Sequence, residues 1–105
     1  MNNSLAYDVI KDQYDLDTLK EIAEHGCLYG VATIHIYYSE TTKFFDQYED
    51  EITDYIETLL GTDYLVVTFS NNDGHLRSYK NDIVWKYIEL VAGEIVDEAE
   101  ELEVA

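Results

Sequence analysis

Carboxylates three or four residues apart dominate the stretch 39–61, SETTKFFDQYEDEITDYIETLLG. If this stretch is one helix, those side chains form a row on the face opposite the apolar side chains. The row consists of Asp46, Asp50, Asp54 and Glu57, and Glu49 and Glu51 flank the apolar side. Residues four apart rise about 6 Å, so the row would carry negative charge over about 16 Å of helix.

A stiff row of carboxylates can occupy Arg and Lys side chains that otherwise hold nucleic-acid phosphates, which are spaced a few ångströms apart. Like charges four apart destabilise a helix by a few tenths of a kcal/mol per pair. Within 39–61 only Lys43 can relieve this repulsion. The row therefore predicts a binding surface for basic proteins. The alternative is a solvated face that contributes only solubility.

The stretch 81–103 repeats the pattern, with seven acids and no basic residue between Glu89 and Glu103. Several of these acids would lie on the far side of a helix from its apolar face. We expect the partner-binding carboxylates to come from both stretches: Asp46, Glu49, Asp50, Asp54, Glu57, Glu89, Asp97, Glu100 and Glu101. We expect Trp85 to be buried, the alternative being an exposed aromatic anchor for a protein partner.

The sequence gives only weak support for a catalytic site or a metal site. His25 and Cys27 form the one nucleophile–base pair, but residues two apart point different ways on a helix, and no Gly-rich turn follows. The histidines and the single cysteine lack zinc-ligand spacing. The segment 71–74 lacks the ligand pattern of an EF-hand loop. We expect no enzyme, cofactor or metal site, and keep an enzyme using Cys27 and His25 as a third hypothesis.

Three segments are predicted to form helices. Asp15 or Asp17 would cap a helix over 15–26 that ends at Gly26. Ser39 or Thr41 would cap the helix over 39–61, which ends at Gly61, and Asn81 or Asp82 would cap the helix over 81–103. The expected core face of 39–61 holds Phe44, Phe45, Tyr48, Ile52, Tyr55, Ile56 and Leu59. That of 81–103 holds Val84, Ile88, Val91, Ala92, Ile95, Ala99 and Leu102.

The remaining stretches favour β-structure. Residues 62–79 predict a hairpin, because Tyr64–Phe69 is rich in β-formers and Asp73-Gly74 is a strong turn signal. Residues 27–38 predict a strand, with a buried helix as the alternative. Residues 1–14 fit either a strand or a short helix. The expected fold class is α+β, with two long amphipathic helices and a short helix packed on a small antiparallel hairpin or sheet, in a single domain over 1–105.

The overall charge limits the partners. The 105 residues carry 23 acids against 6 Lys and Arg, a net charge of -17, and 47% are apolar, enough for a core. Such a chain is repelled by nucleic acid and anionic membranes and attracted to basic proteins. No stretch is apolar enough to span a membrane, no signal peptide is recognisable, and there is one cysteine, so we expect a cytoplasmic protein.

Three motifs carry a family resemblance. They are DTLKEIAEHGC (17–27), IYYSETTKFFDQYEDEI (36–52), and Ile83-Val84-Trp85 with Tyr87 and Glu89. With these, the chain resembles a family of short acidic proteins of uncharacterised function carried by phages and plasmids. The resemblance covers about half of the chain, leaves out 62–79 and brings no catalytic residue. It implies an origin in a mobile element, whose small acidic proteins often resemble anti-CRISPR and anti-restriction inhibitors.

Together these observations predict a non-enzymatic inhibitor of host defence in the host-cell cytoplasm. The leading hypothesis is an anti-CRISPR protein whose acidic helix faces bind the basic nucleic-acid channel of a Cas effector. One alternative is an anti-restriction DNA mimic. Another is a structural or adaptor module whose aromatic surface binds a partner or a second copy, giving a homodimer. We expect neither direct nucleic-acid binding nor membrane binding.

Overall fold

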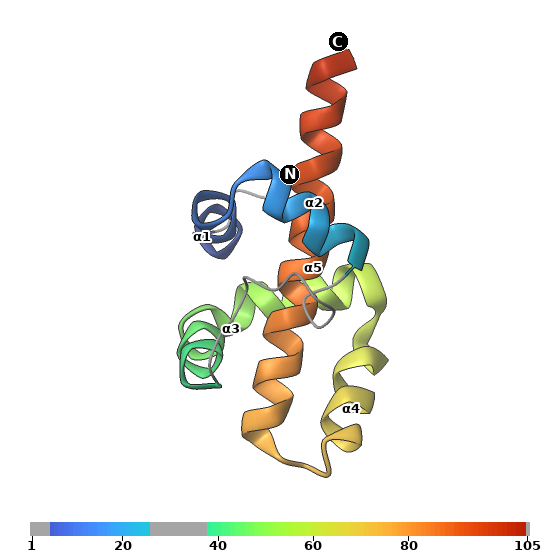
Figure 1. Cartoon of the computed structure of the whole chain (residues 1–105). Coiled ribbons are helices and arrows are strands. Elements are labelled where there is room, and N and C mark those ends of the chain that lie inside the picture. Colours follow the sequence, from blue (N-terminus) through green and yellow to red (C-terminus); the bar gives the residue numbers. More distant parts are fainter. Residues whose placement is uncertain (1–4, 26–37, 105) are drawn as a thin grey trace. The chain divides into compact units, whose positions relative to one another are not determined.

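The structure is a computed structural model that describes residues 5–25 and 38–104. Within these ranges the regular structure consists of five helices and no strand, so the α+β prediction is wrong (Figure 1). The helices are α1 (Leu5–Gln13), α2 (Leu16–His25), α3 (Tyr38–Leu60), α4 (Thr62–Asn71) and α5 (Leu76–Val104). The strand predicted over 27–38 lies outside the described residues, apart from the first residue of α3.

The predicted β-hairpin over 62–79 is replaced by α4, a turn and the start of α5. Strand propensity is a preference of about 1 kcal/mol that packing readily overrides, and α4 packs against α3. The turn chemistry was correctly located, because Asp73 and Gly74 have φ of 54° and 68°. They join two helices instead of two strands. The Gly74 amide closes the end of α4 by donating to the Phe69 carbonyl at 3.1 Å.

Of the segment 1–14, for which a strand or a short helix was predicted, residues 5–13 form α1, so the helical alternative is correct there, and residues 1–4 lie outside the described residues. The predicted helix over 15–26 is confirmed as α2. Asp15 is its cap, since the Thr18 amide donates to Asp15 Oδ1 at 2.8 Å. This hydrogen bond lowers the pKa of Asp15 below its ordinary value, because it stabilises the carboxylate.

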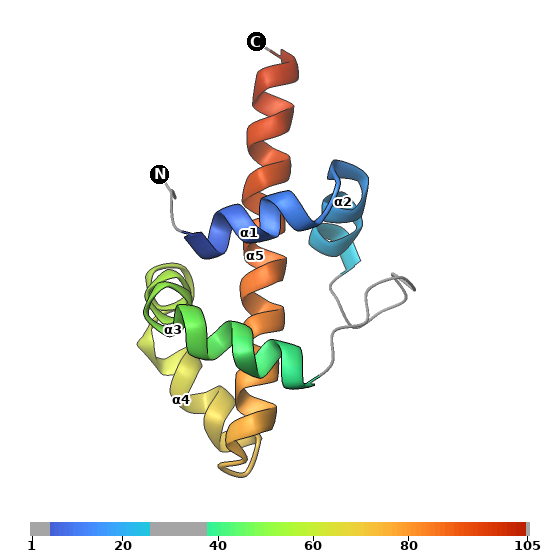
Figure 2. The ribbon, with the colours of Figure 1, turned by 90° about the vertical axis from the view of Figure 1, so that its left-hand side faces the viewer.

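The central helix α3 agrees with its predicted bounds but is not straight. It ends at Gly61, whose φ of 90° stops the helix. Tyr48 has non-helical angles, φ -124° and ψ 28°, so α3 consists of two segments joined by a kink. Figures 1 and 2 show these segments running in different directions. Neither Ser39 nor Thr41 is the cap, because both lie inside α3.

One of two compact units of the chain is Ile36–Tyr87, with α3, α4 and the first part of α5. Its described core contains the fully or nearly buried side chains of Thr41, Phe45, Ile52, Ile56, Ile83, Val84 and Tyr87. Rings extend this core: Phe44 and Tyr55 both pack on Tyr87, and Phe45 and Phe69 both pack on Tyr79. Aromatic contacts of this kind contribute about 0.5–1.5 kcal/mol each beyond burial.

Polar side chains also join α5 to its neighbours within this unit. The Thr41 hydroxyl of α3 donates to Asn81 Oδ1 at 3.0 Å. The amide of Asn72, just after α4, donates to Asp82 Oδ2 at 3.2 Å. Asn81 and Asp82 therefore bond to other segments and do not cap a helix, which corrects the predicted start of α5. The true start, Leu76, lies more than a turn earlier.

The other unit comprises Met1–His35 and Ile88–Ala105, and its described helices are α1, α2 and the rest of α5. Figure 2 shows α1 running across the later part of α5. The core consists of the buried residues Ala6, Tyr7, Ile10, Leu19, Ile22, Ile88, Val91, Ala92, Ile95 and Val96. Leu102, predicted for the core face, is instead 79% exposed. The Tyr7 hydroxyl donates to Glu98 Oε1 at 3.2 Å.

Candidate acidic binding surface

All five candidate carboxylates of α3 are exposed, as a binding surface requires. The kink at Tyr48 divides them, because Asp46 belongs to the first segment of α3 and the other four to the second. The single straight row predicted from Asp46 to Glu57 is therefore wrong. We define the α3 acidic face as Glu49, Asp50, Asp54 and Glu57.

Asp46 differs from the other four because a cation neutralises it. Lys80 Nζ of α5 lies 2.6 Å from Asp46 Oδ1, and the same ammonium lies 5.7 Å from the centre of the Phe45 ring. Sequence reasoning missed this pair, since the two residues are 34 positions apart and only Lys43 was considered as a counter-charge. Asp46 holds α5 against α3, and it is a poor candidate for binding a partner.

The carboxylates of the α3 acidic face have no cationic partner of the kind that Asp46 has, among the residues that the structure describes. In the part of the chain that the structure describes, no ion pair involves Glu49, Asp50, Asp54 or Glu57. Two neighbouring threonine hydroxyls donate to backbone carbonyls of the helix and not to these carboxylates. Thr53 donates to the Glu49 carbonyl and Thr58 to the Asp54 carbonyl, both at 2.8 Å. The four carboxylates lie within about 12 Å along the axis, given a rise of 1.5 Å per residue.

The charge of this face affects Tyr79 of α5. Burial raises the pKa of the half-buried Tyr79 hydroxyl above its ordinary value, and the negative charges of Glu49 and Glu57 raise it further. A phenolate would be repelled by these carboxylates, so the neutral phenol is favoured. The negative charges of the α3 acidic face therefore affect the ionisation of a neighbouring side chain on α5.

The candidate carboxylates of α5 belong to the other unit and form a separate group. Asp97, Glu100 and Glu101 are exposed in the last turns of α5. Glu89 is half-buried and already has an interaction partner within the chain. Asp97, Glu100 and Glu101 are therefore accessible to a partner, and Glu89 is a weaker candidate.

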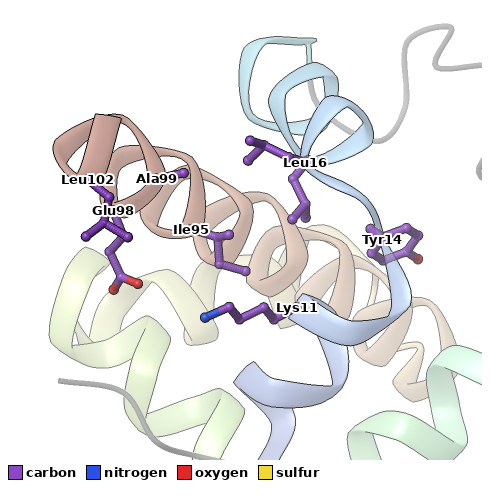
Figure 3. Close-up of a pocket in the computed structure, with 8 residues that line it drawn as sticks. Lys11, Tyr14, Leu16, Ile95, Glu98, Ala99 and Leu102 are labelled. Atoms are coloured by element: carbon purple, nitrogen blue, oxygen red, sulfur yellow. The ribbon is translucent and has the colours of Figure 1, made fainter. Parts of the chain in front are cut away.

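A shallow groove of about 280 Å³ lies in the same unit, between α1, α2 and the end of α5. Figure 3 shows the residues that line it: Lys11, Tyr14, Leu16, Leu19, Ile95, Glu98, Ala99 and Leu102. Its lining is mainly apolar, with one side chain of each charge and neither histidine nor cysteine. Its residues form no catalytic arrangement.

Among the residues suggested for other chemistry, those that the structure describes are not assembled into a site. His25 is exposed, with Nε2 3.6 Å from Glu24 Oε2, and Cys27 and His35 lie outside the described residues. His75 is exposed in the turn before α5. In the described ranges no three His, Cys, Asp or Glu side chains gather as metal ligands would. Trp85 is half-buried, between the two alternatives considered for it.

Comparison with known proteins identifies one family. No curated protein and no solved structure matches the chain. Among the described residues, no helix combines the length and apolar character needed to cross a bilayer. Residues 2–101 match the family described as "Domain of unknown function (DUF7222)". Since this match covers nearly the whole sequence, the chain belongs to the DUF7222 family.

Proposed function

We propose that this protein is a non-enzymatic inhibitor that binds a basic, nucleic-acid-binding surface of another protein through its α3 acidic face. The observation that carries the proposal is the charge of Glu49–Glu57, which contains five acids and no basic residue. Four of these acids are exposed and have no ion pair among the described residues. A face that merely maintains solubility usually mixes both signs of charge.

The spacing of the carboxylates supports a basic channel as the target. Asp50 and Asp54 are one turn apart on α3, about 6 Å along the axis. Arg and Lys side chains that bind successive phosphates are separated by comparable distances. A helix can present its carboxylates to such side chains without first becoming ordered, so binding costs little conformational entropy. Exposed charges also accelerate the encounter, and this effect weakens as salt increases.

The class of target follows from charge and from the resemblance to acidic phage and plasmid proteins. Nucleases of bacterial defence hold DNA or RNA in basic channels, and a mobile element benefits from blocking them. We favour a Cas effector, which would make this protein an anti-CRISPR protein, and a restriction enzyme is the alternative target. The exposed Asp97, Glu100 and Glu101 of α5 supply a second group of carboxylates for the same kind of partner.

The proposal is tested by capture from lysates of bacteria that carry CRISPR and restriction systems, at about 0.1 M and 0.5 M NaCl. The bait is the full chain, and the variant E49Q/D50N/D54N/E57Q removes the α3 acidic face. The control D8N/D12N/E21Q/E24Q removes four exposed carboxylates of α1 and α2, so both variants have the same net charge. Circular dichroism verifies that both remain helical.

The expected result is a basic nuclease complex that the wild type and the control retain at low salt only. The α3 variant should retain about one hundredth as much, since several ion pairs are lost. Equal retention by both variants would show that total charge, and not this face, attracts the partner. Retention that persists at high salt would contradict binding through exposed carboxylates.

A further inference from the structure

Helix α4 is exceptional in the described structure because none of its residues is buried. Val66 and Val67, at its centre, are 61% and 53% exposed. Exposed apolar side chains continue at both of its ends. We define the α4 apolar patch as Leu59, Leu60, Val66, Val67, Phe69 and Leu76.

Contacts within the unit keep this patch exposed. The half-buried side chains of Tyr64, Leu65 and Thr68 occupy the opposite side of α4. Phe69 packs edge-on against Tyr79, with ring centroids 5.3 Å apart, and Leu76 lies one turn before Tyr79 on α5. Leu59 and Leu60 end α3, directly before the Gly61 junction to α4. The fold therefore leaves the patch at the surface and does not bury it.

The patch is large for a protein of this size. Phe69 is the one aromatic side chain of the six, and Leu and Val are smaller, so at about half exposure the six present roughly 500 Å² of apolar surface in total. Monomeric proteins rarely expose more than a few hundred Å² in one place unless the surface has a function. An unused patch of this size would favour aggregation, so it is expected to be covered by a partner.

The low number of charged residues around the α4 apolar patch indicates which partner covers it. The chain carries 23 acids, yet Leu59–Leu76 contains only Asp63 and Asp73. A basic protein would gain little attraction here, whereas it would gain much at the α3 acidic face. A surface of low charge density is what a chain of net charge -17 needs to approach another copy of itself. We propose that α4 pairs with α4 of a second copy, forming a symmetric homodimer through the α4 apolar patch.

The order of residues along α4 is compatible with a pair of α4 helices related by a twofold axis. If two α4 helices pack antiparallel about their centres, Val66 and Val67 of one copy lie beside the same residues of the other. Asp63 then lies opposite Ser70 of the second copy, whose hydroxyl can donate to a carboxylate. The two Asp63 carboxylates are separated by about seven residues of helix, roughly 10 Å, where salt screens their repulsion.

The area sets the expected strength of this dimer. Two copies of the patch would bury at most roughly 1,000 Å², at the lower limit for specific interfaces. We therefore expect a reversible dimer with a dissociation constant in the micromolar range, and not an obligate one. Salt should strengthen the dimer, because it screens the repulsion between two acidic chains. Binding through the α3 acidic face responds to salt in the opposite direction, so the two proposals can be separated.

The test is sedimentation equilibrium of the full chain over a range of concentrations, at low and high salt. The monomer has a mass of 12.2 kDa, so a dimer is resolved easily. Val66→Glu places two carboxylates at the twofold axis, while glutamate keeps a good helix propensity. Leu5→Glu is the matched control, because Leu5 is 65% exposed on α1, outside the patch. Circular dichroism verifies the fold of each variant.

We expect the wild type and Leu5→Glu to dimerise equally and Val66→Glu to dimerise at least about 30-fold more weakly. Mixing Val66→Glu with Val66→Lys should restore a heterodimer, since opposite charges then meet at the axis. A wild type that is monomeric at every concentration would overturn the proposal. A fully dimeric Val66→Glu, or no heterodimer from the mixture, would overturn the α4 pairing.

Discussion

Lys80 of α5 forms an ion pair with Asp46 of α3, with 2.6 Å between Nζ and Oδ1. The same ammonium lies over the ring of Phe45, 5.7 Å from its centre, and the Lys80 side chain is only 17% exposed. One cation thus joins the start of α5 to the first segment of α3. Of the five candidate carboxylates of α3, the four that form no ion pair among the described residues therefore all lie after the kink.

Replacing Lys80 by glutamine should lower the free energy of unfolding by about 1 kcal/mol, through loss of the ion pair and the cation–π contact. The effect is small because Asp46 is more than half exposed. Lys43→Gln is the control, since Lys43 is exposed on α3. Urea denaturation measures both. Equal effects of the two substitutions would mean that the Lys80 contacts do not contribute to stability.

Thr41 offers a test of the buried link between α3 and α5. Thr41→Val removes the hydroxyl that donates to Asn81 Oδ1 and should lower the free energy of unfolding by about 1 kcal/mol, because the half-buried amide oxygen loses this hydrogen bond. Thr53→Val is the control, since the Thr53 hydroxyl bonds to its own helix on the surface. Thermal and urea unfolding measure the difference. A Thr41→Val protein as stable as Thr53→Val would contradict the link.

Two glycines should respond to alanine with opposite signs. An added Cβ meets no atom within 4 Å at either Gly61 or Gly93, so steric contact does not decide the outcome. Gly61 has φ of 90°, and Gly61→Ala should destabilise the protein by about 1–2 kcal/mol. Gly93 lies inside α5, and Gly93→Ala should stabilise it by up to about 1 kcal/mol. Changes of the same sign in urea denaturation would be inconsistent with these backbone conformations.

Alkaline pH should destabilise the protein through two tyrosines. Burial, and then the Glu98 carboxylate, raise the pKa of Tyr7, and burial, Glu49 and Glu57 raise that of Tyr79. The unfolded chain ionises near pH 10, so stability is fully present below about pH 9 and falls above it, as the unfolded state loses protons first.

The measurement is urea denaturation between about pH 9 and pH 11, for the wild type and for Tyr7→Phe. Tyr7→Phe removes one ionising group, so its stability should fall less steeply with pH. It also loses the hydrogen bond to Glu98, which lowers stability at neutral pH by up to about 1 kcal/mol. Parallel pH profiles for the two proteins would show that Tyr7 does not contribute to the alkaline loss.

Some local signals in the sequence located a helix end or a turn correctly, although the predicted caps of α3 and α5 were wrong. Asp15 caps α2 and Gly61 ends α3, as capping rules predict. The turn at Asp73-Gly74 was also placed correctly. These features depend on a few neighbouring residues, whose backbone preferences do not need the rest of the fold.

Errors arose where packing decides the structure. Tyr64–Phe69 has strand propensity, but α4 forms there because a helix packs against α3. Asn81 looked like a cap and instead accepts a bond from Thr41, 40 residues away. Neither proline nor glycine marks the kink at Tyr48. Of the candidate site, exposure of the α3 carboxylates was predicted correctly, and the neutralisation of Asp46 by Lys80 was not.

Displacement of fluorescently labelled DNA from purified Cas effector complexes is the measurement that tests the central claim most directly. The wild type should displace DNA from a susceptible complex, and less effectively as salt increases. The variant E49Q/D50N/D54N/E57Q should need about 100-fold more protein, and the control D8N/D12N/E21Q/E24Q should match the wild type. Equal displacement by the two folded variants would contradict a role for the α3 acidic face.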